Sequence, residues 1–393
     1  MSSKQKLQAA ARMAAIEPFH VMDLLAKARR LESQGRTIVH MEIGEPDFVT
    51  PQTIVDAGIR ALQEGYTHYT PAVGLSELRQ AISHHYQRTY QVNVSPQQVV
   101  VTPGASGALL LILGVLINPG DQVLMTDPGY PCNRHFVRLM EGEAVGIPVD
   151  ATTHYQLTAE LLEKHWTAKP RAVMLASPSN PTGTVIPEAQ LQQLIEFVER
   201  KGVFLIMDEI YHGLVYGTSV STAAARSDNV LVINSFSKYF TMTGWRLGWL
   251  VAPESIIRDI DKLAQNVFLA PATISQHAAL AAFSPETLIV LEQHRAAFEE
   301  RRDFLLPELR KLGFDIAIEP EGAFYLYADC SRFSDDSYAF CESLLQEAGV
   351  AITPGIDFGT YSPQNHVRFA YTTSLDNLRL GIERLTTFLR KLQ

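Results

Sequence analysis

Short apolar runs and helical patterns alternate through residues 50–285, and this alternation constrains the fold more than any other feature of the sequence. Strands and helices in regular succession are typical of a mostly parallel sheet with crossover helices. We expect helices between the strands, for example Gly107–Leu116, Pro187–Lys201 and Glu254–Phe268. The strands that the apolar runs predict are Gln98–Thr102, Gln122–Thr126, Ala172–Ala176, Val203–Met207, Val230–Asn234 and Gly248–Val251.

The last third of the chain changes character at a long helical stretch, Ser284–Leu312. Beyond it, Phe324–Ala328 and His366–Ala370 are expected to be strands, and Leu375–Leu392 is expected to be a terminal helix. The start of the chain contributes one amphipathic helix, near Val21–Leu31.

The length of 393 residues exceeds what one hydrophobic core usually organises, so two or three domains are expected. We predict a large domain at residues 46–285 and a small α+β domain at residues 286–393. The N-terminal segment, residues 1–45, is predicted to pack with the small domain.

Charge, hydropathy and cysteine content argue against several classes of protein. The net charge is −9, and no Lys/Arg-rich run supplies the basic face of a nucleic-acid binder. The longest apolar run, Ala108–Ile117, is too short to cross a membrane. Cys132, Cys330 and Cys341 are widely spaced and odd in number, which is typical of a reduced compartment. We expect a cytoplasmic protein without nucleic-acid or membrane partners.

Familiar nucleotide and metal motifs are missing from the sequence. It has neither the glycine fingerprint of dinucleotide-binding folds nor a P-loop. His and carboxylate residues do not recur at metal-ligand spacing, so no metal site is expected.

Three polar clusters each follow an expected strand directly. They are Ser177–Gly183, Asp208–Tyr211, and Ser235–Lys238, the last continuing into Thr243–Gly248. One such cluster alone would be an ordinary loop with a turn and a cap. Three clusters at strand ends, where open α/β sheets bind ligands, predict a shared site.

These clusters, together with Gly44–Phe48 and Val367–Ala370, give the sequence its likeness to a known family. It resembles the class I/II aminotransferases of the fold-type-I pyridoxal-5'-phosphate superfamily over essentially its whole length. The most specific match is Ser235-x-Ser237-Lys238 with Gly244-Trp245-Arg246 just downstream. The resemblance implies an aminotransferase with pyridoxal 5'-phosphate as its cofactor. It also implies a large domain with a mostly parallel seven-stranded sheet covered by helices on both faces, plus a smaller α+β domain.

The same resemblance assigns roles around the cofactor ring. Lys238 would form the Schiff base and then act as the general base that moves a proton between substrate Cα and the cofactor's C4' carbon. Asp208 would pair with the pyridinium nitrogen and keep it protonated, so that the ring accepts electrons. Asn180 and Tyr211 resemble the pair that hydrogen-bonds the phenolic oxygen, and Tyr130 resembles the aromatic residue that stacks on the ring.

A phosphate group needs donors and positive charge. Gly104, Ala105 and Ser106, with Gly107, lie between an expected strand and the helix Ala108–Leu116, so their backbone N–H groups can point at an anion. Side-chain donors are expected from Ser235, Ser237 and Arg246. By resemblance, Tyr69 contacts the phosphate of the neighbouring subunit, which implies a homodimer with two shared active sites.

The resemblance also indicates the substrate side of the site. Arg368 matches the family arginine that grips the substrate α-carboxylate in a bidentate pair, Asn180 lies with it, and Gly44 would let the backbone approach the substrate. These residues favour transfer from an L-α-amino acid to a 2-oxo acid by a ping-pong mechanism. Aspartate-specific relatives often carry a lysine where this chain has Ser106. We therefore expect a neutral donor, such as alanine, a branched-chain amino acid, methionine or an aromatic amino acid.

Three alternatives stay open at this point. An arginine from another loop could replace the missing lysine, which would allow an aspartate/2-oxoglutarate aminotransferase. A C–S β-lyase uses the same residues and differs in how the reaction is partitioned. A pyridoxal-dependent transcription regulator would carry a DNA-binding module before Gly44, and the forty or so residues there do not have a winged-helix pattern.

Overall fold

A seven-stranded sheet organises the larger part of the molecule in the computed structural model, which describes residues 9–392. The strand order is β2-β8-β7-β6-β5-β3-β4. Neighbouring strands are parallel except that β8 runs antiparallel to both β2 and β7. This mostly parallel seven-stranded sheet confirms the expected fold class. Its strands are β2 (Val99–Thr102), β3 (Gln122–Asp127), β4 (Glu143–Pro148), β5 (Pro170–Ala176), β6 (Phe204–Asp208), β7 (Val230–Ser235) and β8 (Gly248–Val251).

All six strands predicted for this sheet are present, with ends that differ by at most two residues. The strand β4 has no counterpart among the predicted ones. It lies at the edge of the sheet and buries Ile147 but leaves Glu143 and Gly146 exposed, so its sequence lacks an apolar run.

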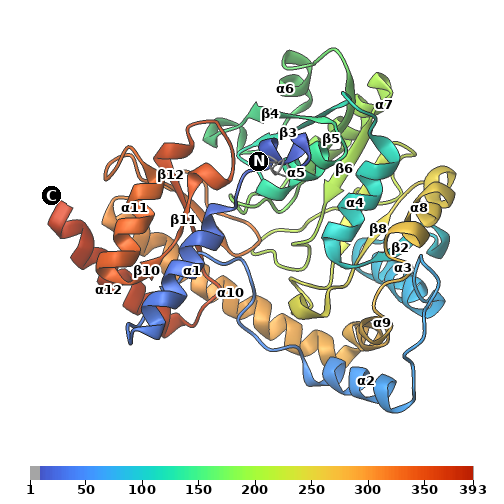
Figure 1. Ribbon diagram of the computed structural model, residues 1–393, viewed down its shortest axis with the longest axis horizontal. Helices are drawn as coiled ribbons and strands as arrows, with labels where there is room; N and C mark the ends of the chain where they lie inside the picture. The colour runs from blue at the N-terminus through green and yellow to red at the C-terminus, as the bar shows by residue number, and fades with distance from the viewer. Residues whose placement is uncertain (1–8, 393) are drawn as a thin grey trace, which may run out of the picture.

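Helices cover both faces of the sheet, as Figure 1 shows. Side chains alternate along each strand, so that Val100 and Leu250 belong to one buried cluster while Val101 and Trp249 belong to the other. Residues of α4, α5 and α8 complete the first cluster, and residues of α3, α7 and α9 pack into the second. The helices of this part are α2 (Gln52–Gln63), α3 (Ser76–Tyr90), α4 (Gly104–Leu116), α5 (Pro131–Leu139), α6 (Ala159–Lys164), α7 (Glu188–Lys201), α8 (Glu254–Val267) and α9 (Thr273–Leu280).

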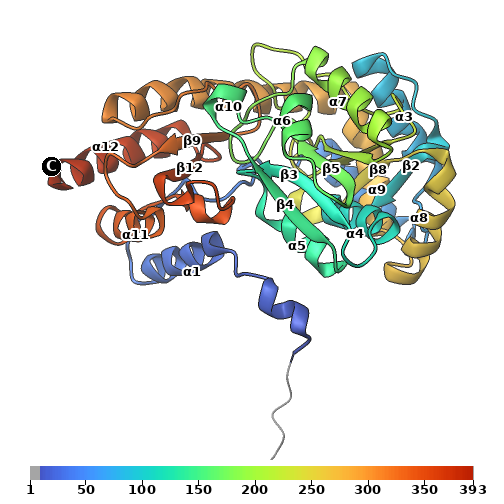
Figure 2. The same cartoon turned by 90° about the horizontal axis from the view of Figure 1, so that it is seen from above.

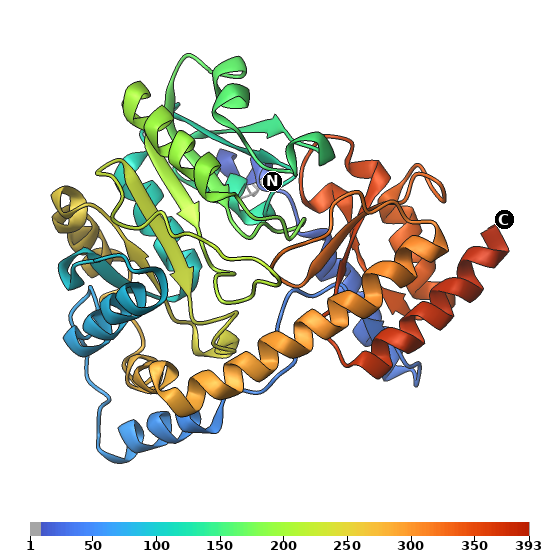
Figure 3. The same cartoon turned by 180° about the vertical axis from the view of Figure 1, so that it is seen from behind.

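A smaller three-stranded antiparallel sheet, in the order β11-β12-β9, lies in the C-terminal third. Figure 3 shows the long helix α10 running from the neighbourhood of α9 to this second part. The elements are α10 (Pro285–Leu312), β9 (Tyr325–Asp329), α11 (Ser337–Ser343), β11 (Thr353–Pro354), β12 (His366–Ala370) and α12 (Leu375–Leu392).

The N-terminal segment joins the C-terminal third. The strand β1 (Val39–His40) pairs in parallel with β10 (Val350–Ala351). The helix α1 (His20–Ser33) packs beside β10 and β11, and Figure 2 shows it (blue) next to the red C-terminal elements. The domain boundaries at 45/46 and 285/286 stay a prediction, and residues 1–8 and 393 of the predicted domains lie outside the described residues.

None of the helices described has the length and apolar character that crossing a bilayer requires. Within residues 9–392, no group of three or more His, Cys, Asp or Glu side chains is arranged to hold a metal ion.

Candidate active site

A cavity of about 670 Å³ lies where the carboxyl ends of the central strands meet the small sheet and the N-terminal segment. Twelve of the fourteen residues singled out from the sequence line it. They are Gly44, Ala105, Ser106, Tyr130, Asn180, Asp208, Tyr211, Ser235, Ser237, Lys238, Arg246 and Arg368. The structure therefore brings together side chains from segments more than 300 residues apart, because strand ends of the large sheet, the segment after β1 and strand β12 all reach this cavity.

Gly104 and Tyr69 do not line this cavity. Gly104 stands just behind the wall, where a Cβ atom would lie 2.6 Å from Arg246 Nη2. Tyr69 lies between α2 and α3 with 82% of its surface exposed. Its expected contact is with another subunit, so its role stays a prediction.

One end of the cavity gathers groups that are able to bind an anion. Gly104–Gly107 are the first turn of α4, which corrects the expectation that they form a loop before the helix. No side chain caps this turn, so its backbone N–H groups are available to a ligand. A Cβ atom on Gly248 would lie 2.9 Å from Ala105 N, so the absence of one lets β8 approach this helix end.

Two hydroxyl groups and one guanidinium group face the same end. The Ser237 N–H donates to Ser235 Oγ at 3.1 Å, and the two serine Oγ atoms lie 2.9 Å apart. Arg246 has a left-handed backbone with φ +50° and anchors itself by donating from Nη1 to the Thr243 carbonyl oxygen at 2.9 Å. These donors and the helix N-terminus match the charge and shape of a phosphate group.

The Lys238 side chain lines the cavity. Its Nζ donates to the Gly44 carbonyl oxygen at 2.7 Å. Burial lowers the pKa of Lys238 to about 8, an effect opposed by Glu45 and reinforced by the positive charges of Arg368 and Arg246. A substantial fraction of this amine is therefore neutral and nucleophilic near pH 8.

Asp208 is the last residue of β6 and lines the cavity. Its Oδ1 accepts the Ile210 N–H at 3.1 Å. Burial raises the pKa of Asp208 to about 7, although the Ile210 N–H and the Lys238 charge pull it down. A cationic ligand beside this carboxyl group would favour its ionised form.

Arg368 lines the cavity from β12 and is 3% exposed. Its Nη1 donates to Asn180 Oδ1 at 2.9 Å, and its Nη2 donates to the Glu42 carbonyl oxygen at 2.5 Å and to Thr353 Oγ1 at 3.1 Å. Among the described residues nothing accepts a hydrogen bond from its buried Nε. This unpaired donor is suited to a carboxylate brought by a ligand.

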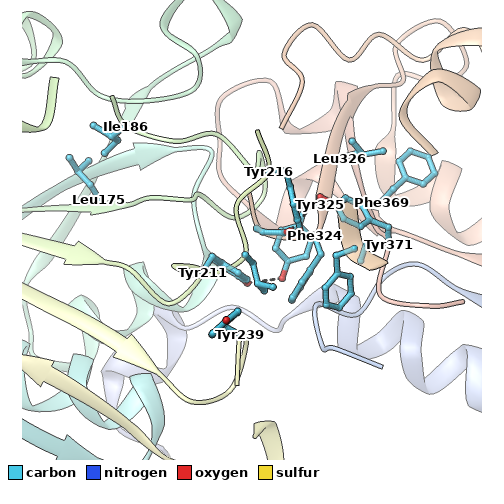
Figure 4. Close-up of a cluster of buried hydrophobic side chains, with 14 of the residues drawn as sticks. Leu175, Ile186, Tyr211, Tyr216, Tyr239, Phe324, Tyr325, Leu326, Phe369 and Tyr371 are labelled. Carbon is cyan, nitrogen blue, oxygen red and sulfur yellow. Dashed lines mark hydrogen bonds between the residues drawn. The ribbon is translucent and has the colours of Figure 1, made fainter. Parts of the chain in front are cut away.

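Two aromatic hydroxyl groups complete the site. Burial raises the pKa of Tyr130 and of Tyr211 well above the ordinary value, so both are neutral donors at physiological pH. The Tyr211 and Tyr325 oxygens lie 2.8 Å apart in a hydrogen bond (Figure 4).

Several lining residues were not expected from the sequence. They are Phe19, Val21, Met22, Glu42, Ile43, Glu45, Leu109, Ala176, Ile210, Thr243 and Tyr325. Glu45 lies inside the Gly44–Phe48 match, so proximity in sequence could have indicated it. Phe19, Val21 and Met22 reach the cavity from the start of α1, and no local pattern indicates that contact.

The fold and the site define a class of protein. A mostly parallel sheet with a buried lysine, a buried carboxyl group and an uncapped helix N-terminus at one cavity is the arrangement of a fold-type-I pyridoxal-phosphate enzyme. Comparison with known proteins gives the family: the model for "Aminotransferase class I and II" matches residues 36–385. The chain belongs to the class I and II aminotransferases, a pyridoxal-phosphate-dependent family of enzymes.

Individual relatives extend over almost the whole chain. A valine--pyruvate aminotransferase of Mycobacterium tuberculosis is 41% identical over 96% of this chain and 97% of its own length. An aspartate aminotransferase of Bacillus subtilis is 35% identical over 98% of this chain and 100% of its own length. The crystal structure of an aminotransferase from Mycobacterium tuberculosis superposes with a TM-score of 0.95 at 40% identity, covering 98% of this chain and 100% of that one.

The residues present fit the cofactor of this family. Gly104 leaves room for the Arg246 guanidinium beside the uncapped end of α4, where a phosphate would be held. The buried Asp208 carboxyl group suits a protonated ring nitrogen, and the buried Lys238 amine suits a carbonyl carbon.

Proposed function

We propose that this enzyme transfers the amino group of a neutral L-α-amino acid to a 2-oxo acid by a ping-pong mechanism. When bound, pyridoxal 5'-phosphate would supply an electron sink next to the substrate Cα. Ala105, Ser106, Ser235, Ser237 and Arg246 would hold its phosphate, and Gly104 would leave room for the arginine. These contacts fix the cofactor's position, and the reaction itself then depends on Lys238 and its neighbours.

Lys238 and Asp208 would carry out the acid–base chemistry. Lys238 would hold the cofactor and then carry a proton to and from the substrate Cα, a role supported by its lowered pKa. Asp208 would keep the ring nitrogen protonated. Asn180 and Tyr211 would donate to the phenolic oxygen, and Tyr130 would cover the face of the ring.

The choice of a neutral donor rests on the charges that line the cavity. Among the described residues that line it, the positively charged ones are Lys238, Arg246 and Arg368. Each already has a proposed partner, namely the cofactor carbonyl, the phosphate and the substrate α-carboxylate. No lining cation is then left for a second substrate carboxylate.

The rest of the wall also favours an uncharged side chain. Phe19, Val21, Met22 and Leu109 present apolar surface, and the acidic Glu45 would repel a carboxylate. The relative from Mycobacterium tuberculosis is named for such a donor, as a valine--pyruvate aminotransferase. The aspartate aminotransferase relative keeps the aspartate/2-oxoglutarate reaction as the alternative.

We also propose that the working unit is a homodimer. Tyr69 is exposed, and so are the apolar side chains of Ile59 and Leu62 on α2 and of Leu269 after α8. A partner subunit would cover these side chains and bring Tyr69 to the phosphate of its own site. We also propose the cytoplasmic compartment that the three widely spaced cysteines of the sequence predict.

Steady-state kinetics with matched donors tests the substrate class. The purified enzyme with pyridoxal 5'-phosphate is assayed with valine, alanine, methionine, phenylalanine and aspartate, each with pyruvate and with 2-oxoglutarate. We expect kcat/KM for at least one neutral donor to exceed that for aspartate. A clear preference for aspartate contradicts the neutral class, and release of pyruvate and ammonia from cystathionine without an acceptor favours the β-lyase.

A further inference from the structure

Tyr325 contacts both Tyr211 and Arg368, two of the proposed active-site residues. It is the first residue of β9, is fully buried, and lines the cavity. Figure 4 shows its side chain reaching from the C-terminal part of the chain toward Tyr211. None of the sequence patterns above indicates a role for it.

Strand pairing places the Tyr325 ring against Arg368. In the antiparallel pair of β9 and β12, Arg368 is directly opposite Tyr327, so Tyr325 is its diagonal neighbour on the same face. The Arg368 Cζ atom lies 4.2 Å from the centre of the Tyr325 ring. At this distance a cation–π interaction holds the guanidinium group and restricts its orientation.

The Tyr325 hydroxyl group is hydrogen-bonded to the Tyr211 hydroxyl group. The hydrogen bond to Tyr211 is the sole one that its oxygen makes among the described residues. If Tyr211 donates its proton to the cofactor, Tyr325 is left as the donor to Tyr211. A chain of two hydroxyl groups strengthens the terminal donor, because each bond polarises the next.

Gly44 makes room for this hydroxyl group. A Cβ atom on Gly44 would lie 1.9 Å from Tyr325 Oη. The carbonyl oxygen of Gly44 accepts the hydrogen bond from Lys238. Tyr325 therefore contacts the segment that orients the lysine, as well as Tyr211 and Arg368.

We propose that Tyr325 is a positioning residue with two separable functions. Its hydroxyl group strengthens the donation of Tyr211 to the cofactor's phenolic oxygen, and its ring fixes Arg368 for the substrate carboxylate. This inference rests on the proposed function, because it takes the roles of Tyr211 and Arg368 from there.

Two substitutions separate the functions. Tyr325→Phe keeps the ring and removes the hydroxyl group, whereas Tyr325→Leu removes both. Tyr327→Phe is the matched control: Tyr327 is buried on the same strand and stacks on His366 at 4.7 Å, but it does not line the cavity. Thermal melting of each variant checks that the fold is retained.

The first readout is the pH titration of the visible absorption band of the bound cofactor. Hydrogen-bond donors to the phenolic oxygen favour its negatively charged form and therefore lower the midpoint pH of this titration. We expect Tyr325→Phe to move the midpoint upward by about half a pH unit, because part of one hydrogen bond is lost. The Tyr327→Phe control should titrate as the wild type does.

The second readout is the dissociation constant of 3-methylbutanoate, a carboxylate without an amino group, measured with the cofactor-loaded protein. Tyr325→Leu should weaken its binding by about tenfold, whereas Tyr325→Phe should bind it nearly as the wild type does.

Two results would overturn the inference. One is a Tyr325→Phe titration identical to the wild type. The other is an equal change of the titration midpoint and of the 3-methylbutanoate dissociation constant in the Phe and Leu variants, which would indicate a packing role alone. A wild-type protein that shows no visible band after addition of pyridoxal 5'-phosphate would instead contradict the proposed function itself.

Discussion

The Lys238 Nζ atom donates a hydrogen bond to the carbonyl oxygen of Gly44 over 2.7 Å, although the two residues are 194 positions apart. The bond joins the turn after β7 to the segment after β1. It holds the amine within the cavity, where burial keeps part of it uncharged. The backbone segment proposed to meet the substrate thus also orients the proposed nucleophile.

Arg368→Ala should impair amino acids far more than amines that lack a carboxylate. We expect a loss of about 3 kcal/mol in transition-state binding, roughly 150-fold in kcat/KM, for the best amino acid donor. The measurement compares kcat/KM for that donor with kcat/KM for the corresponding amine. Because both substrates meet the same variant, any loss of folded protein cancels in the ratio. Equal effects on the two substrates would refute the carboxylate role.

Asp208→Asn should change how the stability of the cofactor-free protein depends on pH. Burial raises the pKa of Asp208 to about 7, whereas the exposed side chain ionises near 3.8. Between these values the folded protein keeps a proton that the unfolded chain has lost. The stability contributed by Asp208 is therefore fully present below about pH 4 and is lost as the pH rises to about 7.

The asparagine variant lacks this titration. Its melting temperature minus that of the wild type should rise from about pH 4 to about pH 7 and then level off, because this is the window between the unfolded and folded pKa values. Thermal melts monitored by circular dichroism give this difference directly. A difference that stays flat from about pH 5 to about pH 8 would argue against a buried, protonated Asp208. In assays with cofactor, the same variant should bind pyridoxal 5'-phosphate but turn over slowly.

Ser106→Lys should shift donor preference toward aspartate. Ser106 is an exposed residue that lines the cavity, where the lining cations already have proposed partners. A new ammonium group there could pair with a second carboxylate, so the ratio of kcat/KM for aspartate to that for valine should rise about tenfold. Ser106→Met provides similar length without charge and should not raise the ratio. An equal rise in both variants would mean that size, not charge, sets the preference.

Much of the fold followed from local pattern. Strands such as Val230–Ser235 are buried along their whole length, so they appear in the sequence as continuous apolar runs. The edge strand β4 escaped prediction because Gly146 interrupts its few apolar residues and Pro148 ends it. The two-residue strands β1, β10 and β11 are too short to give any period, and they form only because tertiary contacts bring their partners together.

The candidate site was predictable where its residues end a strand or begin a helix. Asp208 is the last residue of β6 and Lys238 lies three residues after the end of β7, and both line the cavity. Tyr325 could not be found this way, because its place depends on the register between β9 and β12, about forty residues apart in the chain. The start of α4 at Gly104 was missed because glycines in a sequence usually indicate a loop. In the structure Gly104 has φ +71°, yet the helix begins at this residue.

The visible absorption spectrum of the purified protein, with and without single amino acids, tests the central claim about Lys238 most directly. With pyridoxal 5'-phosphate the wild type should show a visible band that a neutral amino acid bleaches and a 2-oxo acid restores. Lys238→Ala should bind the cofactor weakly and show no turnover. Normal turnover by Lys238→Ala, or no visible band from the wild type after the cofactor is supplied, would contradict the assignment of Lys238.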